Sequence, residues 1–209
     1  VVAAHIGEEV VLGRCLGEDG RPEVALVAVG REALAGNGEE ASRRHVRDVL
    51  AFLGEDAPQV APGDMEAIRQ PLDFLGINYY TRNVCSAAAP WDVKAGGLPL
   101  TDMDWEVYPQ GLTALLLRLH QDYPVPAMFI TENGGAFKDP VINGQVHDAD
   151  RTRYLQTHIE AVRHAMAQGV NMGGYMVWSL MDNFEWASGY AKRFGIVHVD
   201  YDTQKRTLK

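Results

Sequence analysis

Short runs of apolar residues recur from about residue 73 onward and predict β-strands. The clearest runs are residues 73–78 (DFLGIN), 126–131 (PAMFIT) and 174–180 (GYMVWSL). Each run is mostly continuous rather than alternating, which is typical of strands covered on both faces, as in parallel sheets. Polar or aromatic residues follow each run. Side chains capable of chemistry therefore stand where the predicted strands end.

Apolar residues at helical spacing occupy the two intervals between these strands. Residues 109–121 predict a helix with one apolar stripe, made by Leu112, Leu115, Leu116 and Leu119. Residues 151–168 predict a longer helix whose apolar face contains Leu155, Ile159, Val162 and Met166. Asp150 is the expected N-cap of this helix, and Gly169 stands just past its expected end.

The alternation of strands and helices predicts a βαβαβ series with parallel strands. Right-handed crossovers of this kind build either a doubly wound sheet or a (β/α) barrel. The first part of the chain differs, because residues 9–16 and 23–29 predict strands around a turn, and residues 39–53 predict a helix. No chemistry is assigned to residues 1–45, which we treat as an N-terminal segment apart from residues 46–209.

Composition and charge narrow the classes of partner. The 209 residues are 46% apolar and 22% charged, the balance of a globular protein, and the formal net charge is −9. An acidic surface repels phosphate backbones and anionic lipid, so nucleic acid and membrane surfaces are poor partners and a small neutral molecule fits better. No apolar run reaches the roughly 20 residues of a membrane span, and we expect a cytoplasmic protein.

The cysteines and histidines show no spacing that suggests a metal or redox centre. Cys15 and Cys85 lie far apart, and the seven histidines form no motif that places two ring nitrogens on one helix face. We predict no metal and no cofactor. His120, His158 and His164 are expected to be solvated positions or positions at the rim of the helices.

The residues at the predicted strand ends are those that a sugar site requires. They are Asn78, Tyr79, Tyr80, Glu132, Asn133, Trp178, Asp182, Asn183, Glu185 and Trp186. Because the carboxyl ends of parallel strands meet at one edge, these side chains are expected to gather there. Carboxylates and amides bind sugar hydroxyls, aromatic rings stack on the C–H faces of a pyranose, and glycosidic cleavage itself uses carboxylates.

Four stretches in this order resemble glycoside hydrolase family 1, the β-glucosidase type. Residues 129–135 (FITENGG) are similar to the nucleophile signature of that family, and residues 73–80 (DFLGINYY) to the strand that faces the nucleophile. Residues 178–186 (WSLMDNFEW) resemble the last-strand motif that binds the glycone, and residues 192–201 complete the pattern. Together they cover roughly residues 46–209, which makes the match more specific than any one short motif.

The resemblance implies a fold and a set of roles. The fold would be α/β, the C-terminal part of a (β/α)8 TIM barrel, with parallel strands and crossover helices. Glu132 would be the catalytic nucleophile, and Tyr80 would donate a hydrogen bond to it. The sugar-binding residues would be Asn78 beside the nucleophile, Trp178 as a stacking platform, Glu185 and Trp186 on the sugar hydroxyls, and Phe194 as a wall.

Each of these residues also has a purely structural interpretation. Glu132 could be a solvated carboxylate in an Asn-Gly turn, and Trp178 and Trp186 could be core aromatics. Tyr79 is expected to be structural. Glu185 stands between two large aromatic residues and needs a polar partner if it is buried.

Part of the family pattern does not occur in this sequence. The family carries its acid/base glutamate in a Thr-x-Asn-Glu-Pro motif, which is absent here. A closed barrel typically takes about 250 residues, so 209 residues predict an incomplete barrel. An open parallel sheet would expose its edges and an apolar face, which favours association with a complementary chain or with a second copy.

Three hypotheses of function follow. The first is a truncated and catalytically impaired retaining β-glucosidase that acts on small neutral β-glycosides. The second is a non-enzymatic remnant that binds sugar. The third is an interaction module whose function resides in the N-terminal segment.

Overall fold

The structure is a computed structural model that describes residues 72–82 and 97–209. Short stretches before them, at residues 15–16, 22–23, 53–57, 59, 61–64 and 67, are also described. In these stretches β1 (Cys15–Leu16) pairs with β2 (Pro22–Glu23) in antiparallel fashion, and η1 (Gly54–Asp56) is a short 3-10 turn. The rest of the predicted N-terminal strands, and the predicted helix at 39–53 apart from Leu53, lie outside the described residues.

A parallel sheet forms the centre of the described chain. Its strands are β3 (Leu75–Asn78), β4 (Met128–Asn133) and β7 (Met172–Val177), and their order across the sheet is β3-β4-β7. The three strand predictions are confirmed, although β7 begins two residues earlier and ends three residues earlier than predicted and β4 extends two residues beyond the predicted end. Pairing continues that far because Asn78 faces Glu132 on one side of β4 and Val177 faces Asn133 on the other. Glu132 therefore belongs to the strand itself.

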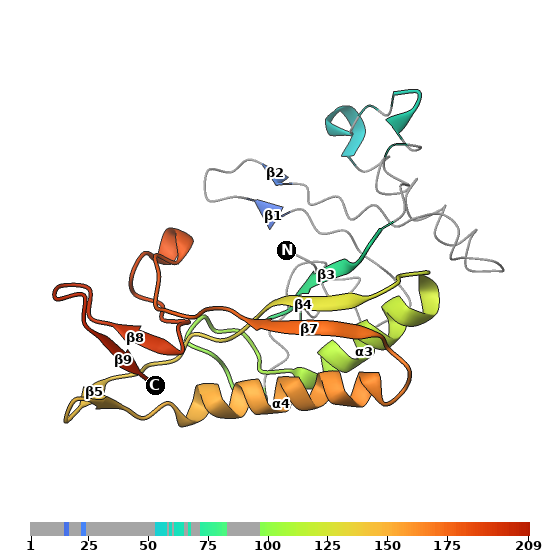
Figure 1. Cartoon of the computed structure of the whole chain (residues 1–209). Helices are drawn as coiled ribbons and strands as arrows, with labels where there is room; N and C mark the ends of the chain where they lie inside the picture. Colours follow the sequence, from blue (N-terminus) through green and yellow to red (C-terminus); the bar gives the residue numbers. More distant parts are fainter. Residues whose placement is uncertain are drawn as a thin grey trace.

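Two helices cover one face of this sheet (Figure 1). They are α3 (Pro109–Asp122), between β3 and β4, and α4 (Ala149–Met166), between β4 and β7. Pro109 occupies the first turn of α3, where its missing N–H costs nothing. Leu112 and Leu116 are fully buried and Leu115 and Leu119 pack at the edge of the same core, so the predicted stripe of α3 is confirmed.

The predicted apolar face of α4 is only partly right. Val162 is buried, but Ile159 and Met166 are about half exposed. The buried face comprises Arg151, Tyr154, His158, Ala161, Val162 and Ala165. The expected N-cap is also wrong, because the helix begins at Ala149, preceded by Asp148 as the capping residue, and Asp150 lies inside it. The buried face of α4 includes polar side chains that have buried hydrogen-bond partners. A prediction from hydrophobicity alone does not include such side chains.

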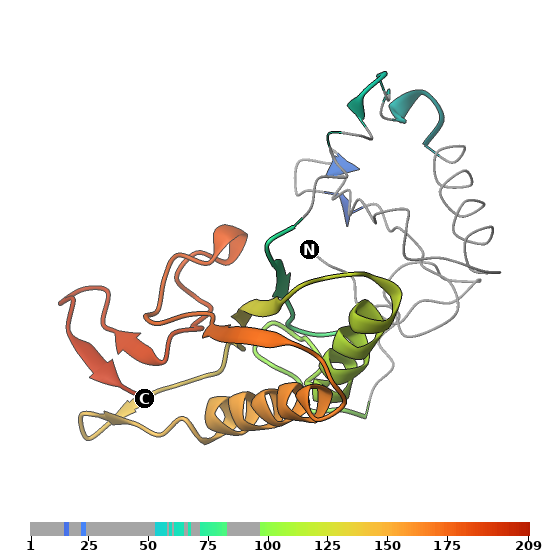
Figure 2. The same cartoon turned by 45° about the vertical axis from the view of Figure 1, so that its right-hand side comes forward.

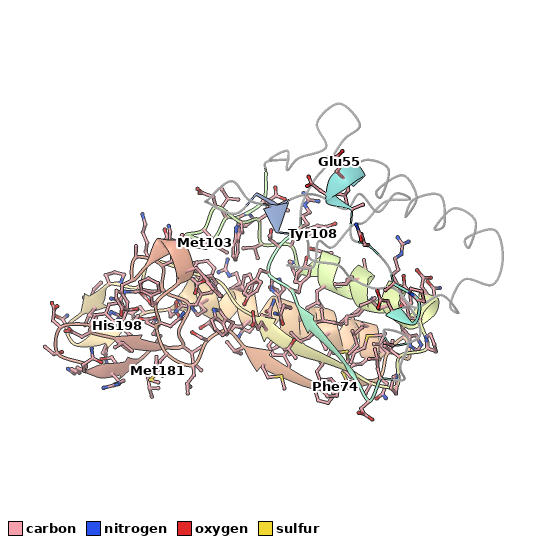
Figure 3. The ribbon with its side chains drawn as sticks, turned by 90° about the horizontal axis from the view of Figure 1, so that it is seen from above. Glu55, Phe74, Met103, Tyr108, Met181 and His198 are labelled. Carbon is pink, nitrogen blue, oxygen red and sulfur yellow. The ribbon has the colours of Figure 1, made fainter. Side chains whose placement is uncertain are left out.

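The opposite face of the sheet is open to solvent in part. Phe74 and Met176 are 54% and 47% exposed, and the ring of Phe74 meets the edge of Phe129 at 5.3 Å between centroids. Phe74 lies at the end of the sheet away from Met181 and His198 (Figure 3). The exposed apolar face expected of an incomplete barrel is thus present in the described residues.

Two hairpins lie beyond the carboxyl ends of the strands (Figure 2). The hairpin of β5 (Val141–Ile142) and β6 (Gln145–Val146) stands between β4 and α4. The hairpin of β8 (Val197–Val199) and β9 (Arg206–Leu208) follows the loop after β7, and β9 contacts β6. That loop contains the turn η2 (Trp186–Ser188). The two hairpins thereby flank the edge where the predicted site residues emerge.

Candidate functional site

Glu132 and Tyr80 meet where β3 and β4 end. The Tyr80 hydroxyl donates a hydrogen bond of 2.6 Å to Oε2 of Glu132. The backbone sets this contact, because the Tyr79 amide donates to the Glu132 carbonyl and keeps the chain after β3 beside β4. Tyr79 points to the helix side, where it is 2% exposed and its hydroxyl donates to the Tyr108 carbonyl at 2.6 Å. Tyr79 is structural, as expected.

Aromatic rings form a wall beside this pair. Phe194 is 1% exposed, and its ring meets the Tyr80 ring edge-on at 6.1 Å between centroids. Trp105 contacts both rings, at 5.5 Å from Tyr80 and 6.1 Å from Phe194. Trp105 was not predicted as a site residue, since it lies in a loop before α3 and belongs to no predicted strand end.

Tyr80 is held as a neutral hydrogen-bond donor. Burial raises the pKa of its phenol, and the hydrogen bond to Glu132 and the negative charges of Glu132 and Glu185 raise it further. Each cause disfavours a phenolate. Tyr80 therefore keeps its proton at any physiological pH and donates a hydrogen bond to the carboxylate.

Glu185 is buried and finds the polar partners that burial requires. It is 7% exposed, and its Oε2 accepts from Asn183 Nδ2 at 3.2 Å and from the Trp178 indole N–H at 3.5 Å. The loop after β7 supplies all three side chains. Trp178 is held at the sheet edge because its amide donates to the Asn133 carbonyl at 2.9 Å.

The remaining two predicted residues lie at the periphery. The Asn78 side chain is exposed, and its Oδ1 accepts from the Thr131 hydroxyl at 2.6 Å. Trp186 is 81% exposed, so the structural interpretation of Trp186 as a core aromatic is wrong. Both groups are accessible to a ligand.

A buried ionic cluster braces the loops that carry these residues. It consists of Asp139, Asp148, Arg151, Asp182, Arg193 and Lys209. The Asp182 carboxylate accepts hydrogen bonds from Arg193 Nη1 at 2.6 Å and from Lys209 Nζ at 2.7 Å. It also accepts one from the Gly195 amide. Burial acts to raise the pKa of Asp182, but the hydrogen bonds from Lys209 and Arg193 outweigh it and hold the pKa below its usual range. Both chain neighbours of Phe194 are bonded to Asp182, Arg193 through its side chain and Gly195 through its amide, so the cluster fixes the aromatic wall.

The sequence analysis missed most of this cluster. It named Asp182 as a strand-end residue, but it gave no role to Arg151 or Arg193. A helical spacing does connect Arg151 with Tyr154 and His158, and it could have indicated a polar buried face. Partners distant in sequence decide that such residues are buried, and spacing does not show these partners.

Gly134 permits the close approach of β4 and the loop after β7. A Cβ atom at Gly134 would lie 1.8 Å from the Trp178 carbonyl oxygen, which is backbone and cannot rotate away. We expect Gly134→Ala to lower the free energy of unfolding by about 1–3 kcal/mol, the usual range for overpacking. Urea denaturation measures this loss.

Gly135→Ala is the matched control for this substitution. Its Cβ would meet the Phe137 ring at 2.8 Å, and a side chain can move aside. We expect a smaller loss of stability. Equal costs for the two variants would contradict the argument from the fixed carbonyl.

Among the residues the structure describes, no group of three or more His, Cys, Asp or Glu side chains is placed to hold a metal ion. In the same part of the chain, every helix is too short or too polar to cross a bilayer.

Comparison with known proteins agrees with this fold. The family model "Glycosyl hydrolase family 1" matches residues 31–209. The chain belongs to glycosyl hydrolase family 1, and its parallel strands and helices are part of a (β/α)8 barrel. The matched range begins before residue 46, where the recognisable motifs were expected to start.

The relatives are β-glycosidases of known activity. The chain is 46% identical over 166 residues to β-glucosidase A of Thermotoga maritima, and 42% identical over 174 residues to a bifunctional β-D-glucosidase/β-D-fucosidase of Bifidobacterium breve. These matches cover 77% and 72% of this chain and 37% of each relative. The structure of the Thermotoga maritima β-glucosidase in complex with glucoimidazole matches with a TM-score of 0.72 and 46% identity over 77% of this chain. The chain thus spans a little over a third of the length of these relatives.

Proposed function

We propose that this chain carries the nucleophile and glycone-binding part of a retaining β-glucosidase. In this proposal Glu132 attacks the anomeric carbon and Tyr80 orients it. Glu185 and Trp186 bind sugar hydroxyls, Trp178 stacks on the sugar, Asn78 binds beside the nucleophile, and Phe194 forms the wall. The substrate is a small neutral β-glycoside, as the names of the relatives indicate for those proteins.

The hydrogen bond of 2.6 Å between Tyr80 and Glu132 carries this proposal. A nucleophilic carboxylate needs a fixed orientation and one oxygen free to attack. Tyr80 engages Oε2 of Glu132, and no hydrogen bond from the described residues is recorded on Oε1. Glu185 accepts from the Trp178 indole N–H, and the Trp178 amide donates to the carbonyl of Asn133, the residue after Glu132, which supports recognition of the sugar near the attacking oxygen.

The reaction would proceed in two stages. In the first stage Glu132 forms a bond to the anomeric carbon as the bond from that carbon to the leaving oxygen breaks, and the electron pair of the broken bond leaves with the oxygen. In the second stage water attacks the anomeric carbon and loses a proton to solvent as the bond to Glu132 breaks, which releases the sugar and restores the carboxylate. An activated phenolate departs without a proton, whereas an alkoxide or sugar needs one from a general acid, a contribution of typically 10²–10⁴-fold. Since the family motif that carries this acid is absent from the sequence, we propose that activated glycosides react and ordinary ones react far more slowly.

Covalent labelling tests the proposal. A dinitrophenyl 2-deoxy-2-fluoro-β-D-glucoside should leave the fluoroglucosyl group on the peptide that contains Glu132, as found by mass spectrometry after digestion. Glu132→Gln should abolish the label, whereas the matched variant Glu160→Gln, on the exposed face of α4, should retain it. A label on another residue, or none at all, would overturn the assignment of Glu132.

The same samples separate the alternative functions. A sugar-binding remnant would bind glucoimidazole in calorimetry and yet show no label on Glu132. An interaction module would lose its function when residues 1–45 are removed, while binding of glucoimidazole stayed unchanged. A β-glucosidase part predicts both binding and labelling in the shortened chain.

Association with itself or with a complementary chain stays a prediction from the sequence. The exposed Phe74 and Met176 on the open sheet face support it, because apolar surface of this kind lies inside a closed barrel. Light scattering of the purified chain tests self-association, and a monomer at micromolar concentration would contradict it. The cytoplasmic location likewise stays a prediction.

A further inference from the structure

Asn133, the residue next to Glu132, is buried on the opposite side of the strand. Its side chain is 0% exposed, although it belongs to a polar residue at a strand end. Its Nδ2 donates to the Tyr79 carbonyl at 2.6 Å and to the Tyr154 hydroxyl at 3.3 Å. Its Oδ1 accepts from the Tyr175 hydroxyl. Both N–H groups and the carbonyl of this amide therefore have partners.

Tyr154 continues this network from α4 to Tyr80. It is 1% exposed, and its hydroxyl donates to the Tyr80 carbonyl at 2.9 Å. Its ring stacks on His158 at 3.9 Å between centroids, with an angle of 23° between the planes. The helix therefore fixes the ring while the hydroxyl reaches the backbone of the site.

The hydrogen bonds run in one direction from β7 to β3. Tyr175 donates to Asn133, Asn133 donates to Tyr154, and Tyr154 donates to the Tyr80 carbonyl. Bonds arranged head to tail polarise and strengthen one another in a buried setting. Asn133 and Tyr154 thus hold two consecutive carbonyls, those of Tyr79 and Tyr80, from beneath the site.

We propose that Asn133 and Tyr154 are positioning residues for the pair of Glu132 and Tyr80. They restrain the two residues separately. Asn133 adjoins Glu132 in the chain, and the Tyr154 hydroxyl donates a hydrogen bond to the Tyr80 carbonyl. The inference rests on the proposed function of Glu132. It adds that hydrogen bonds from Asn133 and Tyr154 keep Tyr80 in place beside Glu132. Both side chains are buried, and neither is hydrogen-bonded to the Glu132 carboxylate.

Asn133 and Tyr154 can affect the reaction because the hydrogen bond from Tyr80 to Glu132 acts only over a short distance. The bond from Tyr80 to Glu132 is 2.6 Å long, and a displacement of the Tyr80 backbone by about 1 Å would break it. A displacement of that size at a reacting group costs up to roughly 10² in rate. A side chain on α4 can therefore control the reaction without contact with the substrate.

Tyr154→Phe tests the proposal, because it removes one oxygen and keeps the stacked ring. We expect labelling of Glu132 by the fluoroglucoside to slow by roughly 10-fold to 100-fold. The matched control is Tyr79→Phe, which removes another buried hydroxyl, one that donates to Tyr108 and not to the network. This control should label within about 2-fold of the unchanged protein, a shift of under 0.5 kcal/mol by the conversion of rates.

A spectroscopic readout separates positioning from a general loss of stability. The Tyr80 hydroxyl proton should give a downfield proton NMR resonance that disappears in Tyr80→Phe, which assigns it. We expect the resonance to move or broaden in Tyr154→Phe and to persist in Tyr79→Phe. If Tyr154→Phe does not fold, as circular dichroism would show, Tyr175→Phe interrupts the same network at its first donor and replaces it in both measurements.

The outcomes distinguish this inference from the function it rests on. If Tyr154→Phe folds, labels at the unchanged rate and keeps the Tyr80 resonance, the positioning role is wrong and the nucleophile stands. If the unchanged protein takes no label but the resonance still responds to Tyr154→Phe, the proposed function is wrong and the positioning of Tyr80 stands. If no label forms and the resonance is unaffected, both are wrong.

Discussion

Replacement of Arg151 by methionine is expected to lower the free energy of unfolding by about 3–5 kcal/mol, the usual cost of removing one partner from a buried ion pair. Arg151 is 1% exposed and lies against Asp139 at 3.6 Å and against Asp148. Its Nη2 also donates to the Arg193 carbonyl at 2.7 Å, and its Nε to the Gly135 carbonyl at 3.2 Å. Methionine keeps an unbranched chain as far as the position of Nε but leaves these buried acceptors without the donor.

The expected loss is large compared with the total stability of most domains, which is about 5–15 kcal/mol. Burial raises the pKa of Asp148, and the charge of Arg151 opposes that rise. Without Arg151 the carboxyl favours its protonated form, which reduces the cost without removing it. Urea denaturation followed by circular dichroism measures the change as a lower midpoint.

Arg118→Met is the matched control, because Arg118 is also a helical arginine paired with an aspartate. Its partner is Asp122, at 3.0 Å and four residues along α3, and the Arg118 side chain is 50% exposed. Exposed pairs of this kind contribute only about 0.3–0.5 kcal/mol. If the two variants lose similar stability, the buried cluster is not what braces the loops around the site.

Acid is expected to destabilise the fold through His158, by about 3 kcal/mol between pH 6.5 and pH 4. His158 is 0% exposed, and burial lowers its pKa to about 4, although the hydrogen bond between Nδ1 and the Tyr154 carbonyl opposes that shift. In the unfolded chain the ring takes a proton near pH 6.5. The unfolded state therefore binds the proton first as the pH falls, so the contribution is fully present above pH 6.5 and is lost toward pH 4.

His158→Gln should remove this part of the pH dependence, because glutamine does not titrate. The remaining acid sensitivity from carboxyl groups is common to both proteins, so the difference between their stability curves isolates His158. The matched control is His164→Gln, at an exposed position on the same helix. If His158→Gln and the unchanged protein lose stability in parallel from pH 6.5 to pH 4, the buried imidazole is not the cause. His158 was expected to be solvated or at a rim, and that expectation is wrong.

Apolar runs were enough to predict the sheet, and apolar residues at helical spacing were enough to predict α3. The three strands and the stripe of α3 are confirmed because each supplies an apolar face to the core between the sheet and the helices. The parallel strands predicted that the strand-end side chains would gather at one edge, and the family resemblance implied that Tyr80 would donate to Glu132, as it does. For these features, the local sequence pattern and the topology of a parallel sheet lead to the same prediction.

The buried face of α4 depended on partners that sequence spacing does not show. Arg151 and His158 are buried although their residue types usually face water. Arg151 is stable there because Asp139 and Asp148 neutralise it, and these residues lie outside the helix. Ile159 and Met166, chosen for their hydrophobicity, lie about half exposed instead.

The sequence by itself therefore determined the family, the parallel strands and the residues of the candidate site at the strand ends. Only the tertiary structure decided which side chains support that site, namely Asn133 and Tyr154 beneath Tyr80, Trp105 beside it, and the ionic cluster around Asp182. The physical reason is that hydrophobic burial follows local periodicity, whereas a buried polar group is stable only where distant segments supply its hydrogen bonds and its opposite charges.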